Sequence, residues 1–165
     1  MRIVTKQGDF GMTDVSFGKV SKHHPLIEVL GQLDQLIAEV TLLAAEFFSF
    51  QEDSKIIIDD CSQICAILSG YQPNYNFKNK IVWLEDTITS LSSDLQFQFV
   101  YPLDNLCAAK LNRVRTLVRS AERCCWRLHE EIPVDSDILI YINRLSDFWY
   151  CQCCKEIERT GKDHV

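Results

Sequence analysis

Hydrophobic residues recur at steps of three and four along most of the chain, and this spacing is typical of amphipathic helices. The clearest run follows Pro25, a residue suited to a first helical position, and contains Leu26, Val29, Leu33, Leu36, Val40 and Leu43. The same period recurs in four later segments. It predicts helices over about 25–50, 54–68, 78–95 and 104–129, and from 135 or 136 to about 159.

The connections between these segments are mostly shorter than ten residues, which favours antiparallel neighbours. The predicted fold class is all-α, a five-helix bundle with ferritin-like up-down packing. Strand propensity is high only in short patches such as Ile56-Ile57-Ile58, where the surrounding period is helical. An α/β fold is therefore the less favoured alternative.

The first 24 residues have no helical period and contain Gly8, Gly11 and Gly18. They predict an ordered loop, with a short strand at Arg2–Thr5. Together with a bundle over 25–160, this loop makes one domain of residues 1–165, a length that can bury a core without disulfides or metal.

Composition narrows the class of protein. Hydrophobic residues make up 47% of the chain and charged residues 24%, which is ordinary for a soluble globular domain. The net charge of -6 argues against nucleic acid as a partner. The sequence has no apolar run long enough to span a membrane and no apolar signal core after its first residues, so a cytoplasmic location is expected.

Eight cysteines are present, and they lie inside helix-like runs rather than in a disulfide framework. We interpret them as mostly reduced thiols. A zinc site is the alternative, although the sequence lacks the paired CxxC motifs that would favour it. Cysteine also serves more often as a small, buried hydrophobic residue than as a metal ligand.

The segment RTLVRSAER places Arg115, Arg119 and Arg123 on one face of a helix, with Glu122 beside them. A solvated stripe of Glu–Arg pairs is one interpretation. The other is a buried or interfacial guanidinium that needs an anion, either a carboxylate such as Asp34 or a phosphate.

Two further polar positions interrupt hydrophobic helices. Asp34 is either the partner of such an arginine or a residue on an exposed turn of its helix. Asn143 and Asp147, one turn apart in YINRLSD, can hold a ribose or a base edge, or simply form an exposed polar face.

The N-terminal segment TKQGDFGMT interleaves glycines with Lys6, Asp9 and Thr13. Glycine lets backbone N–H groups converge on a phosphate, and lysine adds positive charge. Hydroxyl and carboxylate oxygens can bind Mg²⁺ directly or through water. No strand–turn–helix unit surrounds the segment, so it is neither a Walker loop nor a dinucleotide fingerprint.

Taken in order, TKQGDFGMT, FGKVSK, GQLDQL, WLEDTI, FVYP, RTLVRSAER and YINRLSD resemble the PduO-type ATP:cob(I)alamin adenosyltransferases over nearly the whole chain. The resemblance implies a five-helix bundle that assembles as a homotrimer with its active sites between subunits. It also implies ATP, Mg²⁺ and cobalamin as ligands, with cobalamin as a substrate.

The resemblance assigns roles by position. The ATP loop would comprise Thr5, Lys6, Gly8, Asp9, Gly11 and Thr13. Lys22 matches a triphosphate-binding lysine, Arg119 an ATP-binding arginine, and Glu122 and Asn143 further nucleotide positions. Asp34 and Arg115 match a pair that joins two subunits beside the site. Phe99 matches an aromatic residue below the corrin, although from its type alone it could equally be an ordinary core residue.

The chain departs from the family pattern at several positions. Gln7 replaces a threonine, Gln35 a glutamate, Ile37 an asparagine, Asn112 a histidine and Ser120 an arginine, while Leu103 and Asp104 replace two glycines. The last two substitutions would reshape the loop that borders the corrin. The resemblance does not explain the cysteine-rich segment CQCC.

The expected activity is transfer of the 5′-deoxyadenosyl group of ATP to the cobalt of cob(I)alamin, giving adenosylcobalamin and triphosphate. A cobalamin reductase and a B12-dependent mutase would be its partners. Two alternatives stay open: a non-catalytic nucleotide- or corrinoid-binding relative that carries cofactor or regulates a partner, and a helical interaction module whose arginines only make subunit contacts.

Overall fold

The computed structural model describes residues 6, 8–96 and 98–162, and the strand expected at Arg2–Thr5 lies outside them. Five α-helices make up most of this part, as expected from the hydrophobic period. They are α1 (Pro25–Glu46), α2 (Gln51–Leu68), α3 (Phe77–Ser92), α4 (Leu106–Glu131) and α5 (Ser136–Lys162), with the 3-10 helix η1 (Phe48–Phe50) before α2.

Helix ends differ from the prediction by a few residues, for local reasons. The extended backbone of Phe47 ends α1 early, so the predicted continuation to Phe50 becomes η1. At the start of α4 the Asn105 side chain accepts a hydrogen bond from the Ala108 N–H at 2.9 Å. This N-cap places the first helical residue after Asp104, where the prediction had begun the helix.

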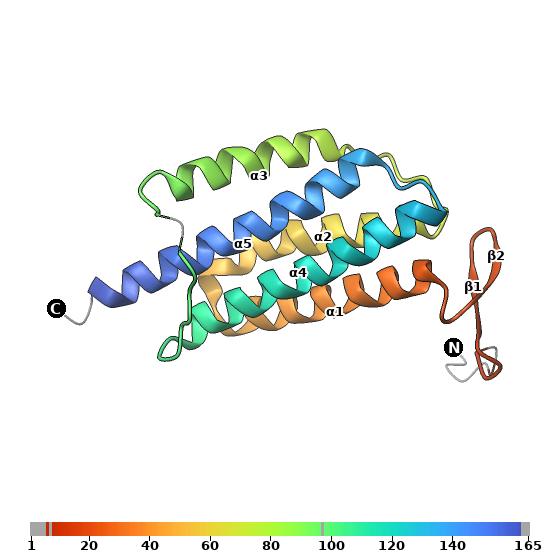
Figure 1. Ribbon diagram of the computed structural model, residues 1–165, viewed down its shortest axis with the longest axis horizontal. Coiled ribbons are helices and arrows are strands. Elements are labelled where there is room, and N and C mark those ends of the chain that lie inside the picture. Colours follow the sequence, from red (N-terminus) through yellow and green to blue (C-terminus); the bar gives the residue numbers. More distant parts are fainter. Residues whose placement is uncertain (1–5, 7, 97, 163–165) are drawn as a thin grey trace.

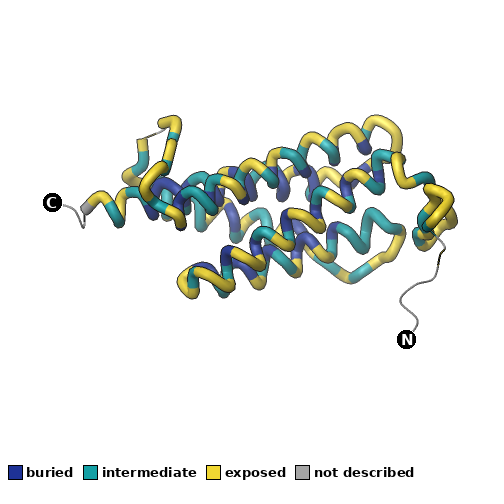
Figure 2. Tube along the Cα trace, turned by 90° about the horizontal axis from the view of Figure 1, so that it is seen from below, coloured by how far each residue is buried: buried dark blue, intermediate teal, exposed yellow. Residues whose placement is uncertain are grey.

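The helices pack up and down as an antiparallel bundle (Figure 1). Helix α1 packs on α2 and α4, while α5 packs on α4 and α3. Figure 2 shows the buried residues along the inward faces of the helices. The core includes Leu33 and Val40 of α1, Leu111 of α4 and the aromatic pair Phe148 and Trp149 of α5, all fully buried. No helix among the described residues is both long and apolar enough to cross a membrane.

A β-hairpin precedes the bundle, which corrects the prediction of a simple loop. Strands β1 (Met12–Val15) and β2 (Gly18–Ser21) pair antiparallel, with Val15 opposite Gly18. The hairpin is tied to the bundle where the Ser16 N–H donates to the Ser69 carbonyl at 3.2 Å. A Cβ on Gly70 would lie 2.2 Å from Ser16 Oγ, so only glycine fits where the hairpin meets the end of α2.

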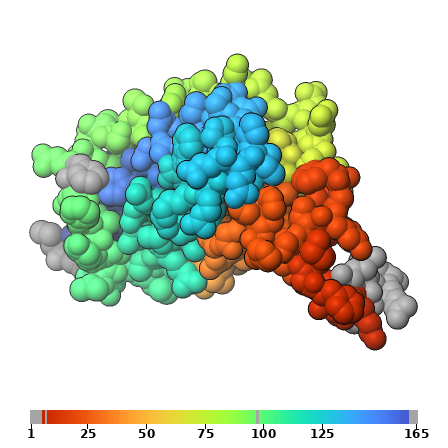
Figure 3. Space-filling model, turned by 45° about the vertical axis from the view of Figure 1, so that its right-hand side comes forward, coloured from red at the N-terminus to blue at the C-terminus, as the bar shows by residue number. Residues whose placement is uncertain are grey.

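The hairpin and the connection between α3 and α4 lie at opposite ends of the bundle (Figure 1). The described part of the N-terminal segment, drawn in red, also projects away from the body of the molecule (Figure 3). Helix α4, with 26 residues, spans roughly 39 Å of this length. Groups at the two ends of one chain are therefore too far apart to act on the same atoms.

One buried carboxylate joins three helices inside the core. Asp60 of α2 is fully buried and accepts a hydrogen bond from Tyr141 of α5 at 2.6 Å. It also accepts from Tyr75 and forms an ion pair with Lys80 of α3 at 3.0 Å. Burial, with a further contribution from nearby Cys61 and Asp60, raises the pKa of Tyr141 well above its usual value. Both tyrosine hydroxyls can therefore donate to Asp60 throughout the physiological range.

Candidate functional site

The first group of predicted site residues surrounds the hairpin. Lys22 Nζ donates to the Gly8 carbonyl at 2.8 Å, and the Lys22 N–H donates to the Gly11 carbonyl at the same distance. A Cβ on Gly8 would lie 2.8 Å from Lys22 Nζ, so this close approach requires glycine or a displaced lysine. Gly11, with a φ of 73°, adopts the left-handed conformation that glycine tolerates.

A hollow of about 740 Å³ opens between the hairpin and α1. Its walls include Thr13, Lys22, Gly31, Asp34 and Tyr71. The size suits a small-molecule ligand, and the lysine supplies positive charge to it. Lys6 and Asp9 of the predicted ATP loop precede the hairpin in the sequence, and both are exposed. Thr5 lies outside the described residues.

The second group lies on the face formed by α4 and α5. Asn143 Nδ2 donates to Glu122 Oε1 at 2.9 Å, and Arg144 Nη1 donates to Asn143 Oδ1 at 2.9 Å. Both ends of the Asn143 amide are thereby oriented. Arg119 is exposed in the single chain, so of the two expected surroundings, buried or interfacial, it is not buried within one chain.

Asp147 belongs to this second group. Burial raises the pKa of its carboxyl, Arg144 lowers it, Glu122 raises it and Arg119 lowers it. The charges of Arg144 and Arg119 therefore act on the Asp147 carboxyl in the direction opposite to burial. The face therefore combines two guanidinium groups with two carboxylates and an oriented amide.

Sequence reasoning missed two members of this face, Arg144 and Trp126. Trp126 lines a hollow of about 240 Å³ together with Glu122, Asn143 and Arg144. It is half exposed and lies one helical turn after Glu122, so the spacing along α4 could have identified it. Its ring stands edge-on to His129, with centroids 5.6 Å apart.

Asp34 and Arg115 face different neighbours within one chain. Asp34 is exposed on α1 and lines the hollow beside the hairpin, and its charge helps to raise the pKa of Cys65, after the larger effect of burial. Arg115 is partly buried on α4, and its charge opposes the rise in the pKa of Cys153. Its Nε donates to Asn112 Oδ1 at 2.9 Å, which gives one of the departures from the family pattern a structural partner.

Phe99 lies at the far end of the bundle, on the segment that joins α3 to α4. Its side chain is 80% exposed, so the alternative that it is an ordinary core residue is wrong. A hollow of about 520 Å³ lies beside it, lined also by Tyr101, Pro102, Asp104 and Ile157. Leu103, one of the two residues that replace glycines, is 96% exposed.

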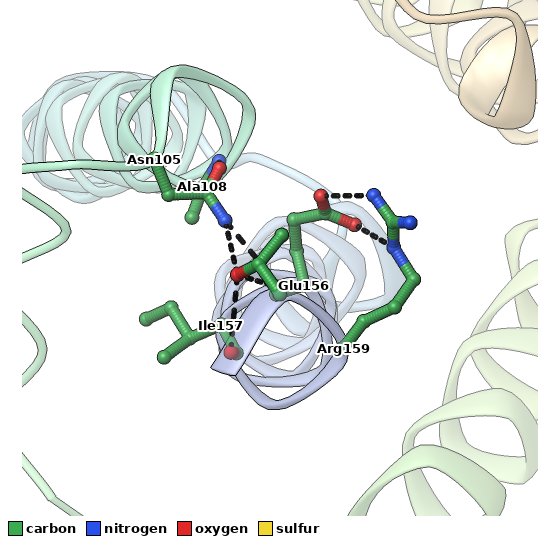
Figure 4. A network of polar contacts seen from close by, with 6 residues as sticks. Asn105, Ala108, Glu156, Ile157 and Arg159 are labelled. Carbon is green, nitrogen blue, oxygen red and sulfur yellow. Dashed lines mark hydrogen bonds and ion pairs between the residues drawn. The ribbon is translucent and has the colours of Figure 1, made fainter. Parts of the chain in front are cut away.

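The α4 end of this segment is anchored to α5 by a polar network (Figure 4). Asn105 Nδ2 donates to Thr160 Oγ1 at 2.9 Å, while Asn105 Oδ1 caps α4. Glu156 lies beside this contact and pairs with Arg159 through two hydrogen bonds of 2.7 and 3.0 Å. The segment therefore enters α4 at a fixed position.

Metal ligation by cysteine finds no support within the described ranges, where no group of three His, Cys, Asp or Glu side chains could hold a metal ion. The cysteines are all unpaired by disulfides, and six of the eight are buried. Burial, reinforced by neighbouring thiols, raises the pKa of Cys125 to about 12 and that of Cys153 to about 11. Such thiols stay protonated at neutral pH and are poor nucleophiles.

Comparison with known proteins identifies relatives over nearly the whole chain. The family model described as cobalamin adenosyltransferase matches residues 3–156. The corrinoid adenosyltransferase of Bacillus subtilis is 28% identical, over 98% of this chain and 89% of that protein. The corrinoid adenosyltransferase PduO of Salmonella typhimurium is 32% identical over 91% of this chain, which spans only 48% of that relative.

Solved structures agree with these relatives. A variant of the PduO-type ATP:corrinoid adenosyltransferase from Lactobacillus reuteri, complexed with cobalamin and ATP, has a TM-score of 0.85 and 24% identity, covering 92% of this chain and 89% of that one. A second variant from the same organism, complexed with ATP, has a TM-score of 0.85 and 25% identity, covering 92% of both chains.

Proposed function

The chain belongs to the cobalamin adenosyltransferase family, and from this premise we propose that it transfers the 5′-deoxyadenosyl group of ATP to the cobalt of cob(I)alamin. The cluster of Arg119, Glu122 and Asn143 carries the proposal. These three residues, which the family resemblance assigns to ATP, come from two helices and lie on one face with the Asn143 amide held in place.

We infer that the working enzyme is a homotrimer with its active sites between subunits. The hairpin group and the α4–α5 group line separate hollows that share no residue, so one chain offers two partial nucleotide sites. Within the described part of one chain Asp34 lines the hollow at the hairpin and Arg115 donates to Asn112, with no ion pair between them, so the proposed pair would come from two chains. Such a pair would join the subunits beside the nucleotide.

The reaction needs little acid–base help from the protein. Cobalt(I) attacks the 5′-carbon with its own electron pair, and the bond from that carbon to the triphosphate oxygen breaks with its electrons leaving on triphosphate. The protein must hold the charge of the leaving group and align the two reactants. Lys6 and Lys22 of one subunit, with Arg119 of another, would provide the positive charge.

Mg²⁺ would reach the site with the triphosphate. The described residues hold no ready-made group of three ligands for it, and Mg²⁺ usually combines substrate phosphates with one or two protein carboxylates. Asp9 and Thr13 of the N-terminal segment supply oxygen atoms of the right kind. The metal would neutralise charge on the leaving group.

Phe99 would act on the cobalamin side. An exposed aromatic ring beside a hollow of about 520 Å³ can pack against the lower face of a corrin and keep water and the dimethylbenzimidazole base away. Cobalt(II) without a lower axial ligand is easier to reduce. Phe99 would therefore assist the reduction that precedes transfer, in which an external reductase supplies the electron.

We place this activity in the cytoplasm, with a cobalamin reductase upstream and a B12-dependent mutase as the acceptor of the product. The unpaired, buried cysteines support a reducing compartment. An anaerobic assay with ATP and chemically reduced cobalamin tests the proposed activity, and the spectrum of adenosylcobalamin is the expected result.

A second candidate is a non-catalytic carrier of nucleotide or corrinoid. The substitution of two glycines by Leu103 and Asp104 favours it, since both side chains are exposed at the segment that would border the corrin. Turnover separates the two candidates, because a carrier would bind both ligands and release them unchanged.

A further inference from the structure

The segment that carries Phe99 is poorly fixed by packing. Phe99, Tyr101 and Leu103 are 80%, 78% and 96% exposed. The hollow of about 520 Å³ beneath them is lined from the other side by Phe47 and by the last turns of α5. We call residues 98–104 the arch. Val100 is the arch residue that packs against the core, so the arch depends on this contact and on the hydrogen bonds at its two ends.

A side chain of α5 binds the start of the arch. The Tyr150 hydroxyl donates to the Gln98 carbonyl at 2.9 Å and also accepts from the Gln98 N–H at 3.0 Å (Figure 1 shows α5 passing this segment). The Gln98 carbonyl belongs to the peptide group that continues into Phe99. Fixing both peptide groups of Gln98 therefore fixes the direction in which the chain enters Phe99.

The support for this hydroxyl is rigid. Tyr150 directly follows Phe148 and Trp149, which are fully buried and stack edge-on at 5.0 Å. The other end of the arch is held by the bond from Asn105 to Thr160, also on α5. One helix thus anchors both ends, which is the kind of support that keeps a binding group in position.

We propose that Tyr150 is a positioning residue: its hydroxyl clamps Gln98 and so holds the Phe99 ring where it can cover the lower face of a corrin. The inference rests on the proposed function, because it gives the clamp a purpose only if Phe99 meets cobalamin. Burial raises the pKa of Tyr150, so its hydroxyl keeps the proton that it donates to the Gln98 carbonyl.

The variant Tyr150→Phe tests the proposal because it removes only the hydroxyl. The matched control is Tyr75→Phe, which removes a hydroxyl bonded to Asp59 and Asp60 in the core, far from the arch. The loss of two neutral hydrogen bonds should lower the ratio of the conformation in which the Gln98 backbone is bound to the one in which it is released by about tenfold or more. Circular dichroism should show the same helical content in both variants.

The first readout needs no ligand. Hydrogen exchange at the Gln98 amide, which donates to the Tyr150 hydroxyl, should become about tenfold faster in Tyr150→Phe and stay unchanged in Tyr75→Phe. The second readout is the fraction of four-coordinate cob(II)alamin formed with saturating ATP, measured by electron paramagnetic resonance. It should fall several-fold in Tyr150→Phe, while ATP affinity, measured by calorimetry, stays the same.

The two readouts separate failure of the clamp from failure of the function. Unchanged exchange in Tyr150→Phe, or a four-coordinate fraction equal to that of the wild type, overturns the positioning role of Tyr150. If the wild-type protein itself forms no four-coordinate species with ATP, the proposed role of Phe99 fails and the clamp loses its purpose, whatever the exchange rates show.

Discussion

Asn143 and Glu122 join α5 to α4 through a hydrogen bond of 2.9 Å between the amide Nδ2 and the carboxylate Oε1. Neither residue is fully buried, so the pair is accessible to a ligand. Arg144 holds the other end of the amide and is itself paired with Glu85 of α3 at 2.9 Å. Three helices thus fix the orientation of one polar group at the surface.

Replacing Asn143 by alanine should weaken ATP binding while the fold survives. The change removes a polar contact and leaves the Glu122 carboxylate without its partner, next to a negatively charged ligand. A hydrogen bond that involves a charged group is worth about 1.5–3 kcal/mol, so the dissociation constant should rise about tenfold or more. Calorimetry measures it. Gln152→Ala, on the same helix but bonded to Asp53, is the control, and equal affinities for all three proteins would remove Asn143 from the site.

The subunit pair can be tested by exchanging its charges. Asp34→Arg and Arg115→Asp should each weaken trimer assembly, because like charges would then meet across the interface. Losing one partner of a desolvated pair typically costs about 3–5 kcal/mol. The double exchange should restore the trimer in sedimentation velocity. A double variant as weak as either single one, or a monomeric wild type at micromolar concentration, would rule out this pairing.

Asp60 should contribute strongly to stability. Asp60→Ala leaves the hydroxyls of Tyr75 and Tyr141 and the Lys80 ammonium without their common acceptor. The free energy of unfolding in urea should fall by about 3 kcal/mol or more. Glu52→Ala breaks an exposed ion pair with Lys55 and should have almost no effect. Similar losses in the two variants would contradict the buried network.

The buried thiols predict a loss of stability in alkaline solution. The pKa of Cys125 rises from 9.0 to about 12 on folding, and that of Cys153 from 9.0 to about 11. Above pH 9 these thiols ionise in the unfolded chain but stay protonated in the folded one. The unfolded state then binds fewer protons, so the free energy of unfolding falls as the pH rises. Their contribution is complete below pH 9 and is lost between pH 9 and about 11–12.

Urea unfolding with a reductant at pH 8, 9, 10 and 10.5 measures this dependence. Each such thiol contributes a slope of about 1.4 kcal/mol per pH unit in its window. The Cys125→Ala variant should show a slope that is smaller by about this amount. The account of the thiols is wrong if the wild type and the variant lose stability in parallel.

The bundle could be predicted because hydrophobic spacing reports directly on helical faces. The hairpin could not, because its strands have four residues each and its turn, Ser16-Phe17, lacks the usual signals. Asp60 illustrates an available signal that was missed: it follows the buried Ile57 by three residues and precedes the buried Ile64 by four, so its phase places it inside.

The candidate site could be predicted only in part from the sequence, for a different reason. The spacing of Arg119 and Glu122 along one helix identifies a shared face. It does not tell whether that face meets solvent, a ligand or another chain, and Arg119 is exposed in the single chain. Likewise, Phe99 is exposed because it lies on the segment that joins α3 to α4. Such a segment has no hydrophobic period from which the exposure of its side chains could be predicted.

The most direct measurement of the central claim is anaerobic turnover of cob(I)alamin with ATP, followed by absorbance. The wild-type protein should produce adenosylcobalamin and an equal amount of triphosphate. Arg119→Ala should be slowed by at least about tenfold. Arg113 lies on the same helix as Arg119 but pairs with Glu39 of α1, so Arg113→Ala should match the wild type. Binding of ATP and cobalamin by the wild type without any adenosylcobalamin would contradict the account and identify a carrier instead.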